Sequence, residues 1–97
     1  MRKMDVVKVP GENSKRKVFM YALSTCAWCK KAKQFLKENK VEYEYVDVDL
    51  CGTEDKEKVR KEILSRGGSL SYPTIIIDDK ILITGFRKDK LKEALEL

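Results

Sequence analysis

The stretch of sequence that decides the fold is VFMYALSTCAWCKKAKQFLKEN, residues 18–39. It opens with six almost wholly apolar residues, which are typical of a central strand that is buried on both faces. After a Ser-Thr break, apolar side chains recur at helical spacing through residues 27–39, and lysines fill most of the other positions. Two cysteines, Cys26 and Cys29, stand at the junction. The segment therefore predicts a buried strand that leads directly into an amphipathic helix, with two thiols where the helix begins.

The residues that follow predict a second strand and a second helix. Residues 41–49 alternate between apolar and charged side chains, which is the period-two pattern of a strand. Gly52 and Thr53 provide a turn and an N-cap, and acidic residues follow in the expected first helical turn. Gly67 and Gly68 end this helix. Its expected buried stripe is Val59, Ile63 and Leu64.

Toward the C-terminus the pattern predicts a hairpin and a last helix. Pro73 opens a strand at Thr74–Ile77, and residues 81–83 form its partner. The turn between them is too short for anything but an antiparallel pair. Asp89 is expected to cap the last helix. The residues expected to face inward from that helix are Leu91, Ala94 and Leu95.

The order of these elements, β-α-β-α-β-β-α, predicts an α/β fold. The first two strands can be parallel only through the helix between them, and that crossover is expected to be right-handed. We therefore expect a four-stranded mixed sheet flanked by three helices, formed by residues 18–97. Residues 1–17 are expected to form a basic N-terminal arm, either mobile or an edge strand, because Pro10 confines any strand there to a sheet edge.

Length and composition exclude several classes of protein. A chain of 97 residues has room for one core, and its 42% apolar and 38% charged residues are typical of a soluble globular domain. A disordered tail and a disulfide-framework toxin are both excluded. No apolar run is long enough to span a bilayer, and no secretory signal is visible. We expect a monomeric, cytoplasmic protein that binds no membrane.

The formal charge of +5 is concentrated at the N-terminus. Residues 1–17 carry six Lys or Arg and two Asp or Glu, whereas residues 18–97 carry fifteen and fourteen. A nearly neutral body lacks the basic face that nucleic-acid binding requires. We therefore expect no nucleic-acid partner.

The chain has no histidine and three cysteines. Without histidine there is no Ser-His or Cys-His nucleophile pair, and the commonest metal ligand is missing. An odd cysteine count without a secretory signal favours a reducing compartment and a reactive or metal-binding thiol pair. Cys51, which follows the second predicted strand, is expected to be a bystander near the surface.

The spacing Cys26-Ala27-Trp28-Cys29 favours thiol–disulfide exchange. Residues three apart in the first turn of a helix lie on one face, so their sulfurs can form a disulfide without unwinding it. Unpaired N–H groups and the positive end of the helix dipole favour the thiolate of the first cysteine. Cys26 is thus the expected nucleophile and Cys29 the more buried resolving thiol. Two other interpretations stay open: half of a zinc site shared between subunits, and two incidental buried cysteines.

Three motifs, in this order, resemble those of the glutaredoxin family over residues 18–97: Cys26-Ala27-Trp28-Cys29, Tyr72-Pro73-Thr74 and Gly85-Phe86-Arg87-Lys88-Asp89. The resemblance implies the thioredoxin/glutaredoxin fold and a disulfide oxidoreductase activity. It also implies that Pro73 is cis and lies against the active-site sulfur, and that the backbone of Tyr72 pairs with bound substrate like an added strand. Trp28, Gly85 and Phe86 are expected to belong to the substrate-binding surface, with packing under the first helix as the alternative role of Trp28.

The departures from that family bear on the reductant. Glutaredoxins that use glutathione commonly carry Pro-Tyr between their cysteines, where this chain has Ala27-Trp28. They usually have a cation three residues before the first cysteine, where this chain has Leu23. The segment from Gly85 is similar instead to redoxins that donate electrons to ribonucleotide reductase and are reduced by a thioredoxin-type reductase. The resemblance therefore implies a disulfide-bearing protein as substrate, an external reductase in preference to glutathione, and no bound cofactor or metal.

Two other functions stay open. Some glutaredoxins hold an iron–sulfur cluster between two subunits through the first cysteine, here Cys26, although most of those lack a second active cysteine such as Cys29. The third function is that of an interaction module that keeps the fold without the chemistry.

Overall fold

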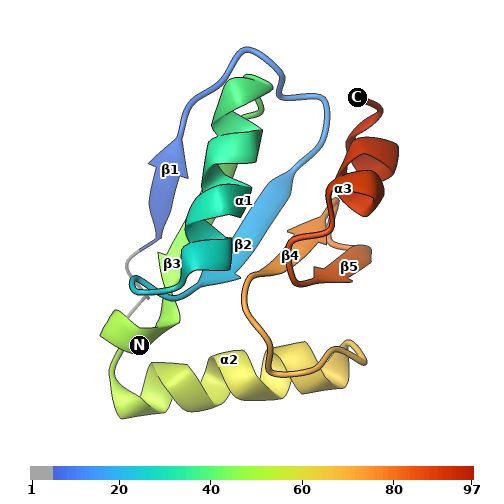
Figure 1. Ribbon diagram of the computed structural model, residues 1–97. Helices are drawn as coiled ribbons and strands as arrows, with labels where there is room; N and C mark the ends of the chain where they lie inside the picture. Colours follow the sequence, from blue (N-terminus) through green and yellow to red (C-terminus); the bar gives the residue numbers. More distant parts are fainter. Residues whose placement is uncertain (1–5) are drawn as a thin grey trace.

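The computed structural model describes residues 6–97, which form one sheet with helices on both faces (Figure 1). Residues 1–5 of the expected N-terminal arm lie outside the described range. The strands are β1 (Val7–Val9), β2 (Val18–Ala22), β3 (Tyr43–Asp47), β4 (Thr74–Ile77) and β5 (Ile81–Thr84). The helices are α1 (Ala27–Glu38), α2 (Thr53–Ser65) and α3 (Lys88–Leu95), and a short 3₁₀ helix, η1 (Val48–Leu50), joins β3 to α2.

The sheet of the described chain has five strands, in the order β1-β3-β2-β4-β5, so the prediction of four strands is wrong. The mixed character of the sheet is confirmed: β2 and β3 are parallel, and all other neighbours are antiparallel. The fifth strand is β1, in which Val7 lies opposite Tyr45 and Val9 opposite Tyr43. It falls within residues 1–17, whose local pattern left open whether they form a mobile arm or an edge strand. The edge strand forms because the open edge of β3 offers N–H and C=O groups that need partners.

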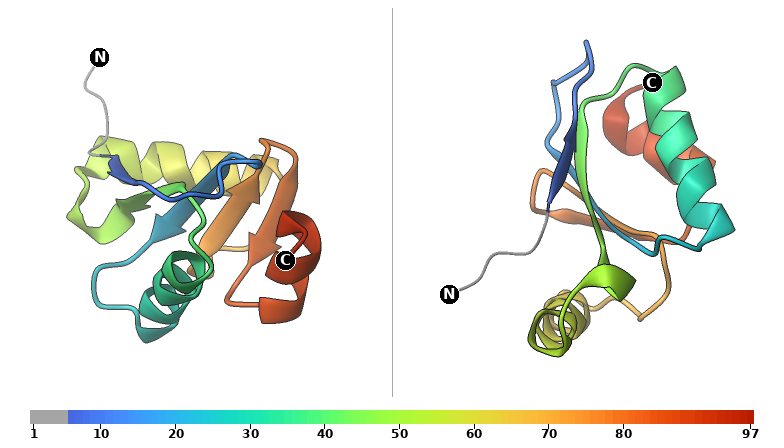
Figure 2. Two further views of the ribbon diagram at one scale, coloured as in Figure 1. Left: turned by 90° about the horizontal axis from the view of Figure 1, so that it is seen from above. Right: turned by 90° about the vertical axis from the view of Figure 1, so that its left-hand side faces the viewer.

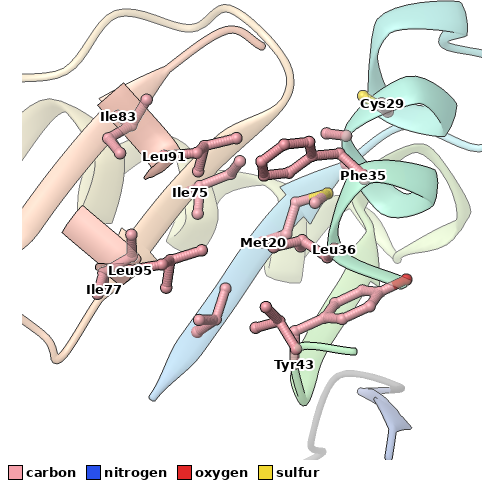
Figure 3. Close-up of a cluster of buried hydrophobic side chains, with 14 residues drawn as sticks. Met20, Cys29, Phe35, Leu36, Tyr43, Ile75, Ile77, Ile83, Leu91 and Leu95 are labelled. Atoms are coloured by element: carbon pink, nitrogen blue, oxygen red, sulfur yellow. The ribbon is translucent and has the colours of Figure 1, made fainter. Parts of the chain in front are cut away.

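The three helices cover both faces of the sheet: α1 and α3 lie on one face and α2 on the other (Figure 2). Under α1 and α3 lies the larger core cluster, in which Leu36, Ile75 and Leu91 have no exposed surface (Figure 3). A smaller cluster around Val59 and Ile63 joins α2 to the opposite face. Burial on both faces explains why β2 is apolar throughout. Within residues 6–97, no helix combines the length and the apolar character that a bilayer span needs.

Two local expectations about the helices are wrong. Leu64, expected in the buried stripe of α2, is 44% exposed. It lies about 100° around the helix from the buried Ile63, which already faces the sheet. Asp89 does not cap α3, because the helix begins earlier: the N–H of Leu91 donates to the carbonyl of Arg87, which holds the N-cap position. Asp89 lies instead in the first turn, where its carboxylate faces the positive end of the helix dipole.

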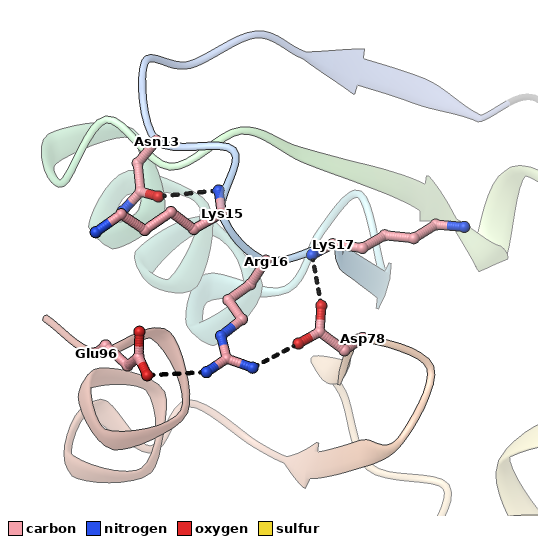
Figure 4. Close-up of polar contacts among 6 residues, drawn as sticks. All are labelled: Asn13, Lys15, Arg16, Lys17, Asp78 and Glu96. Atoms are coloured by element: carbon pink, nitrogen blue, oxygen red, sulfur yellow. Dashed lines mark hydrogen bonds and ion pairs between the residues drawn. The ribbon is translucent and has the colours of Figure 1, made fainter.

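The hairpin turn between β4 and β5 also anchors the segment that leads into β2 (Figure 4). Asp78 and Asp79 both have positive φ, 54° and 58°, which suits a tight turn between antiparallel strands. The carboxylate of Asp78 accepts hydrogen bonds from the guanidinium of Arg16 at 2.8 Å and from the backbone N–H of Lys17 at 2.9 Å. Arg16 also pairs with Glu96 at 2.9 Å, so this one side chain joins the segment before β2 to the hairpin and to the end of α3.

Further toward the N-terminus, the chain runs close to the loop between α1 and β3. The N–H of Asn13 donates to the carbonyl of Lys40 at 2.8 Å, and the N–H of Glu42 donates to the carbonyl of Asn13 at 2.9 Å. A Cβ atom at Gly11 would lie 2.6 Å from backbone atoms of Lys40 and Glu42. Glycine is therefore required there by the close approach of two backbones.

Candidate active site

Cys26 occupies the N-cap of α1, between the end of β2 and the first helical turn. Its backbone is extended, with φ −87° and ψ 117°, and its Sγ accepts a hydrogen bond from the N–H of Cys29 at 3.2 Å. The first turn of α1 holds no acidic residue. The partly exposed sulfur thus lies at the positive end of the helix dipole, in a place that favours an anion.

Cys29 lies one turn further along α1 and has no exposed surface. Burial raises the pKa of the Cys29 thiol to about 12, and its hydrogen bond with the Cys26 side chain adds to the rise. A hydrogen bond with the backbone of Leu23 and the positive charge of Lys33 act in the opposite direction. At neutral pH the reduced protein therefore holds Cys29 as a thiol, beside a second sulfur that solvent reaches.

Tyr72 and Pro73 place a backbone carbonyl against the outer sulfur. The Tyr72-Pro73 peptide bond is cis, as the resemblance implies, and the thiol of Cys26 donates to the Tyr72 carbonyl at 3.8 Å. Pro73 is buried, and its own carbonyl accepts from the N–H of Gly85 at 2.7 Å. Gly85 has φ +82°, a conformation that favours glycine. The start of β4 and the end of β5 thus meet beside Cys26.

Trp28 and Phe86 form the aromatic part of the same surface. The Trp28 side chain is 57% exposed, so the alternative role of packing under α1 is not the one it takes. Its ring centroid lies 6.5 Å from that of Phe86, and Phe86 lies 5.9 Å from the buried Phe35. The structure therefore gathers all seven site residues expected from the sequence at one end of the sheet: Cys26, Trp28, Cys29, Tyr72, Pro73, Gly85 and Phe86.

The structure also shows two polar contacts at the site that sequence reasoning missed. The carboxylate of Asp49 accepts hydrogen bonds from both the N–H and the hydroxyl of Ser24, at 2.8 and 2.5 Å. These bonds lower the pKa of Asp49 and tie the loop before Cys26 to η1. Lys33 pairs with Asp47 at 3.3 Å. From the sequence, Asp47 and Asp49 could be interpreted only as the polar positions of an alternating strand. That pattern does not predict a partner for Asp47 14 residues away or for Asp49 25 residues away.

Cys51 does not join the thiol pair. It packs against the core cluster under α2, on the other face of the sheet from Cys29, and its thiol donates to the carbonyl of Asp47 at 3.7 Å. Within residues 6–97 no three Cys, Asp or Glu side chains are gathered in a way that would hold a metal ion.

Known proteins are similar to this chain in sequence. The family profile described as Glutaredoxin matches residues 18–82, which is more than half of the chain. Over 77 residues the chain is 35% identical to a glutaredoxin-like 8.6 kDa protein in a rubredoxin operon of Clostridium pasteurianum. That match covers 79% of this chain and 95% of the relative.

Solved structures agree with the sequence match. The glutaredoxin of Methanosarcina mazei Go1 superimposes with a TM-score of 0.85 at 38% identity, covering 95% of this chain and 88% of that one. Methanoredoxin of Methanosarcina acetivorans gives a TM-score of 0.77 at 43% identity, covering 84% and 85% of the two chains. Both proteins have the thioredoxin-type fold that the sheet and helices above describe. Sequence and structure lead to the same conclusion: this chain belongs to the glutaredoxin family.

Proposed function

We propose that this protein is a dithiol–disulfide oxidoreductase that reduces disulfides in other proteins, with Cys26 as nucleophile and Cys29 as resolving thiol. The observation that carries the proposal is the difference between the two thiols. Cys26 is partly exposed at a helix N-terminus, whereas Cys29 is buried and its pKa is raised to about 12. Attack by an exposed thiolate and release by an internal thiol require such a difference.

The reaction transfers two electrons in two exchange steps. The Cys26 thiolate attacks one sulfur of the substrate disulfide, so a Cys26–substrate disulfide forms as the substrate S–S bond breaks, and the departing sulfur takes a proton from water. Cys29 then loses its proton and attacks Sγ of Cys26. This second attack breaks the mixed disulfide and releases the other substrate thiol. The protein ends with a Cys26–Cys29 disulfide and the substrate with two thiols.

The second step requires that the buried Cys29 can ionise. Two of the causes that raise its pKa, the hydrogen bond and the charge of Cys26, act only while Cys26 is free. In the mixed disulfide Cys26 has no proton and no charge, so both causes disappear; burial, the largest cause, still raises the pKa of Cys29, and the positive charge of Lys33 still lowers it. Formation of the intermediate thus favours the thiolate that resolves it.

The substrate is a disulfide-bearing protein segment that lies along the backbone at Tyr72. The Tyr72 carbonyl lies beside the Cys26 sulfur, so an extended chain whose cysteine reaches Cys26 can pair with this backbone. Trp28, Gly85 and Phe86 complete the surface that the segment covers.

The proposal includes an external reductase of the thioredoxin-reductase type as the source of electrons, in preference to glutathione. It includes no bound cofactor or metal, a monomeric protein, and a cytoplasmic location, where thiols are kept reduced. Leu23 supports the choice of reductant. It is partly buried against the core cluster under α2 and offers no charge to the carboxylate of a tripeptide.

The test of the activity is insulin reduction with dithiothreitol as terminal reductant. Cys26→Ser should lose activity by at least about a hundredfold, because the attacking thiolate is gone. Cys29→Ser, reduced first and then mixed with insulin after dithiothreitol has been removed, should accumulate a mixed disulfide that mass spectrometry detects. Cys51→Ser is the matched control and should keep the activity, because Cys51 packs under α2. Turnover that survives without Cys26 contradicts the proposal.

The reductant is tested separately, with the Cys26–Cys29 disulfide form as substrate. NADPH consumption is followed with thioredoxin reductase alone, and in parallel with glutathione and glutathione reductase. The proposal expects faster consumption with thioredoxin reductase. Faster consumption with glutathione would reject this part of the proposal while leaving the dithiol mechanism intact.

A further inference from the structure

Beside Cys26 the surface carries a row of aromatic rings and cations whose charge the proposed function leaves unexplained. The Lys31 ammonium lies 4.4 Å from the centre of the Trp28 ring, and Trp28 contacts Phe86. Phe86 in turn contacts Phe35, whose ring centre is 6.0 Å from the Lys88 ammonium. These five side chains connect α1 to the start of α3, and we call this surface the aromatic ridge.

The ridge offers an apolar anchor that is already in place. Phe35 is buried, and its ring packs against that of Phe86. Trp28, in contrast, is 57% exposed. An exposed Trp is costly to hydrate and is the side chain most often found to dominate binding when a partner covers it. A partner residue of apolar character therefore has a preformed surface to cover next to the reactive sulfur.

The two chain segments that carry the ridge are rich in cations. Lys31 and Lys88 lie on its aromatic rings, and the other exposed cations of these segments are Lys30, Arg87 and Lys90. Asp89 is the one acidic residue in the same two segments, residues 26–33 and 85–90, and the remaining cation, Lys33, is paired with Asp47. Residues 18–97 carry fifteen cations and fourteen anions, so the excess here is a local arrangement rather than a result of composition.

We propose that the aromatic ridge selects acidic protein segments: the preferred substrate carries Asp or Glu residues near its disulfide and an apolar side chain that covers Trp28 and Phe86. This inference rests on the proposed function and specifies its substrate class. The electron transfer is the one described above, and the ridge changes only how often and how long a substrate disulfide meets Cys26. Opposite charge raises the rate of encounter, and this effect is screened by salt.

The experiment uses two synthetic peptides of equal length, each closed by one disulfide and each with a phenylalanine next to a cysteine. Three flanking residues are glutamate in one peptide and lysine in the other. The second-order rate constant for oxidation of the reduced protein by each peptide is measured by acid quench. Each value is divided by the rate constant for the same peptide with dithiothreitol, which removes the difference in intrinsic reactivity.

The normalised rate constant should be about tenfold or more larger for the acidic peptide at low salt, and the ratio should fall toward one at about 0.5 M salt. Lys31→Glu combined with Lys88→Glu should abolish or reverse the preference, because these are the two cations that lie on the rings of the ridge. Arg60→Glu combined with Lys61→Glu is the matched control: it makes the same change of charge on exposed residues of α2, across the sheet, and should keep the preference.

The apolar part is tested with acidic peptides that carry phenylalanine or serine next to the cysteine. The phenylalanine peptide should react about threefold or more faster with the native protein, and Trp28→Ala should remove this advantage. If both peptides of the charge pair are reduced at equal normalised rates at low salt, the inference is wrong and the proposed function stands. If no disulfide oxidises the reduced protein, the proposed function is wrong, and the inference that rests on it is wrong as well.

Discussion

At the scale of single residues, Cys26 and Cys29 are identical side chains that one helical turn places in different surroundings. The N-cap position leaves the Cys26 sulfur partly exposed and in contact with a backbone N–H. The next position on the same face of α1 buries Cys29 in the larger core cluster. The difference in chemistry between the two thiols is therefore a difference in hydration and hydrogen bonding.

The raised pKa of Cys29 predicts a loss of stability in alkali. Its ordinary value is 9.0 and its folded value about 12, so an unfolded chain ionises this thiol first. The contribution of Cys29 is fully present below pH 9.0 and is lost as pH rises toward about 12. In guanidinium unfolding under reducing conditions, the free energy of unfolding should fall more steeply above pH 9.0 for the native protein than for Cys29→Ser.

The comparison with Cys29→Ser isolates this effect from other buried groups. Burial also raises the pKa values of Tyr21 and Tyr43, but those side chains are present in both proteins and cancel in the difference. The pKa of Tyr72 is raised by burial and by the charge of Cys29, so the difference between the two proteins includes this second effect of the Cys29 thiolate. Parallel curves above pH 9.0 would show that the Cys29 thiol ionises equally well in the folded and unfolded chains.

At the scale of secondary-structure elements, the packing of each helix on the sheet depends on which of its residues face the sheet and not on how many apolar residues it contains. In α2, Val59 and Ile63 lie in the core while Leu64 is 44% exposed. In α1, the four buried residues return at helical spacing and start at Cys29, so the thiol is part of the stripe that docks the helix. The site is thus fixed to the core through the same face that packs the helix.

This difference within α2 predicts opposite outcomes for two neighbouring substitutions. Ile63→Ala should lower the free energy of unfolding by about 2–5 kcal/mol, because it removes a side chain with no exposed surface and leaves a cavity. Leu64→Ala should change it by no more than about 0.5 kcal/mol. Denaturant unfolding of both variants measures this, and equal losses would mean that α2 is rotated relative to the sheet.

At the scale of the whole molecule, the contacts of Arg16 connect three segments that lie far apart in the chain. The guanidinium binds Asp78, 62 residues away, and Glu96, 80 residues away (Figure 4). The same segment places its Lys17 N–H on Asp78. The β4–β5 turn, the end of α3 and the entry to β2 are thus held at one end of the sheet, away from the loops that carry the thiols.

The Arg16–Asp78 contact predicts a specific sensitivity to acid. Hydrogen bonding from Arg16 lowers the pKa of Asp78 below its ordinary 3.8, so the contribution of this carboxylate is present above pH 3.8 and is lost as pH falls through the folded value. Thermal unfolding between neutral pH and about pH 2.5 should show a shallower acid decline for Arg16→Gln than for the native protein. Arg60→Gln removes an exposed pair with Glu57 and should decline like the native protein. An unchanged decline in Arg16→Gln would contradict the prediction.

Most of the elements and the thiol pair could be predicted from local pattern. The apolar run at residues 18–22, the stripe of α1 and the hairpin turn at Asp78 and Asp79 each depend on neighbours a few residues apart, and periodicity reports such neighbours directly. The four strands predicted from residues 18–97 are all present, because each has a period or a composition of its own. The glutaredoxin motifs added the expectation of a cis Pro73 beside Cys26, which the structure bears out.

What the sequence by itself determined, then, is the order of the elements and the position of two thiols where a helix begins. Tertiary structure alone decided that β1 pairs with the edge of β3 and that Asp49 binds the loop before Cys26. It also decided that Trp28 is exposed, whereas Phe86 packs against the buried Phe35. Each of these depends on atoms brought together from distant parts of the chain. Local periodicity does not predict these contacts. The free energy that stabilises them comes from residues that become neighbours only after the sheet has formed.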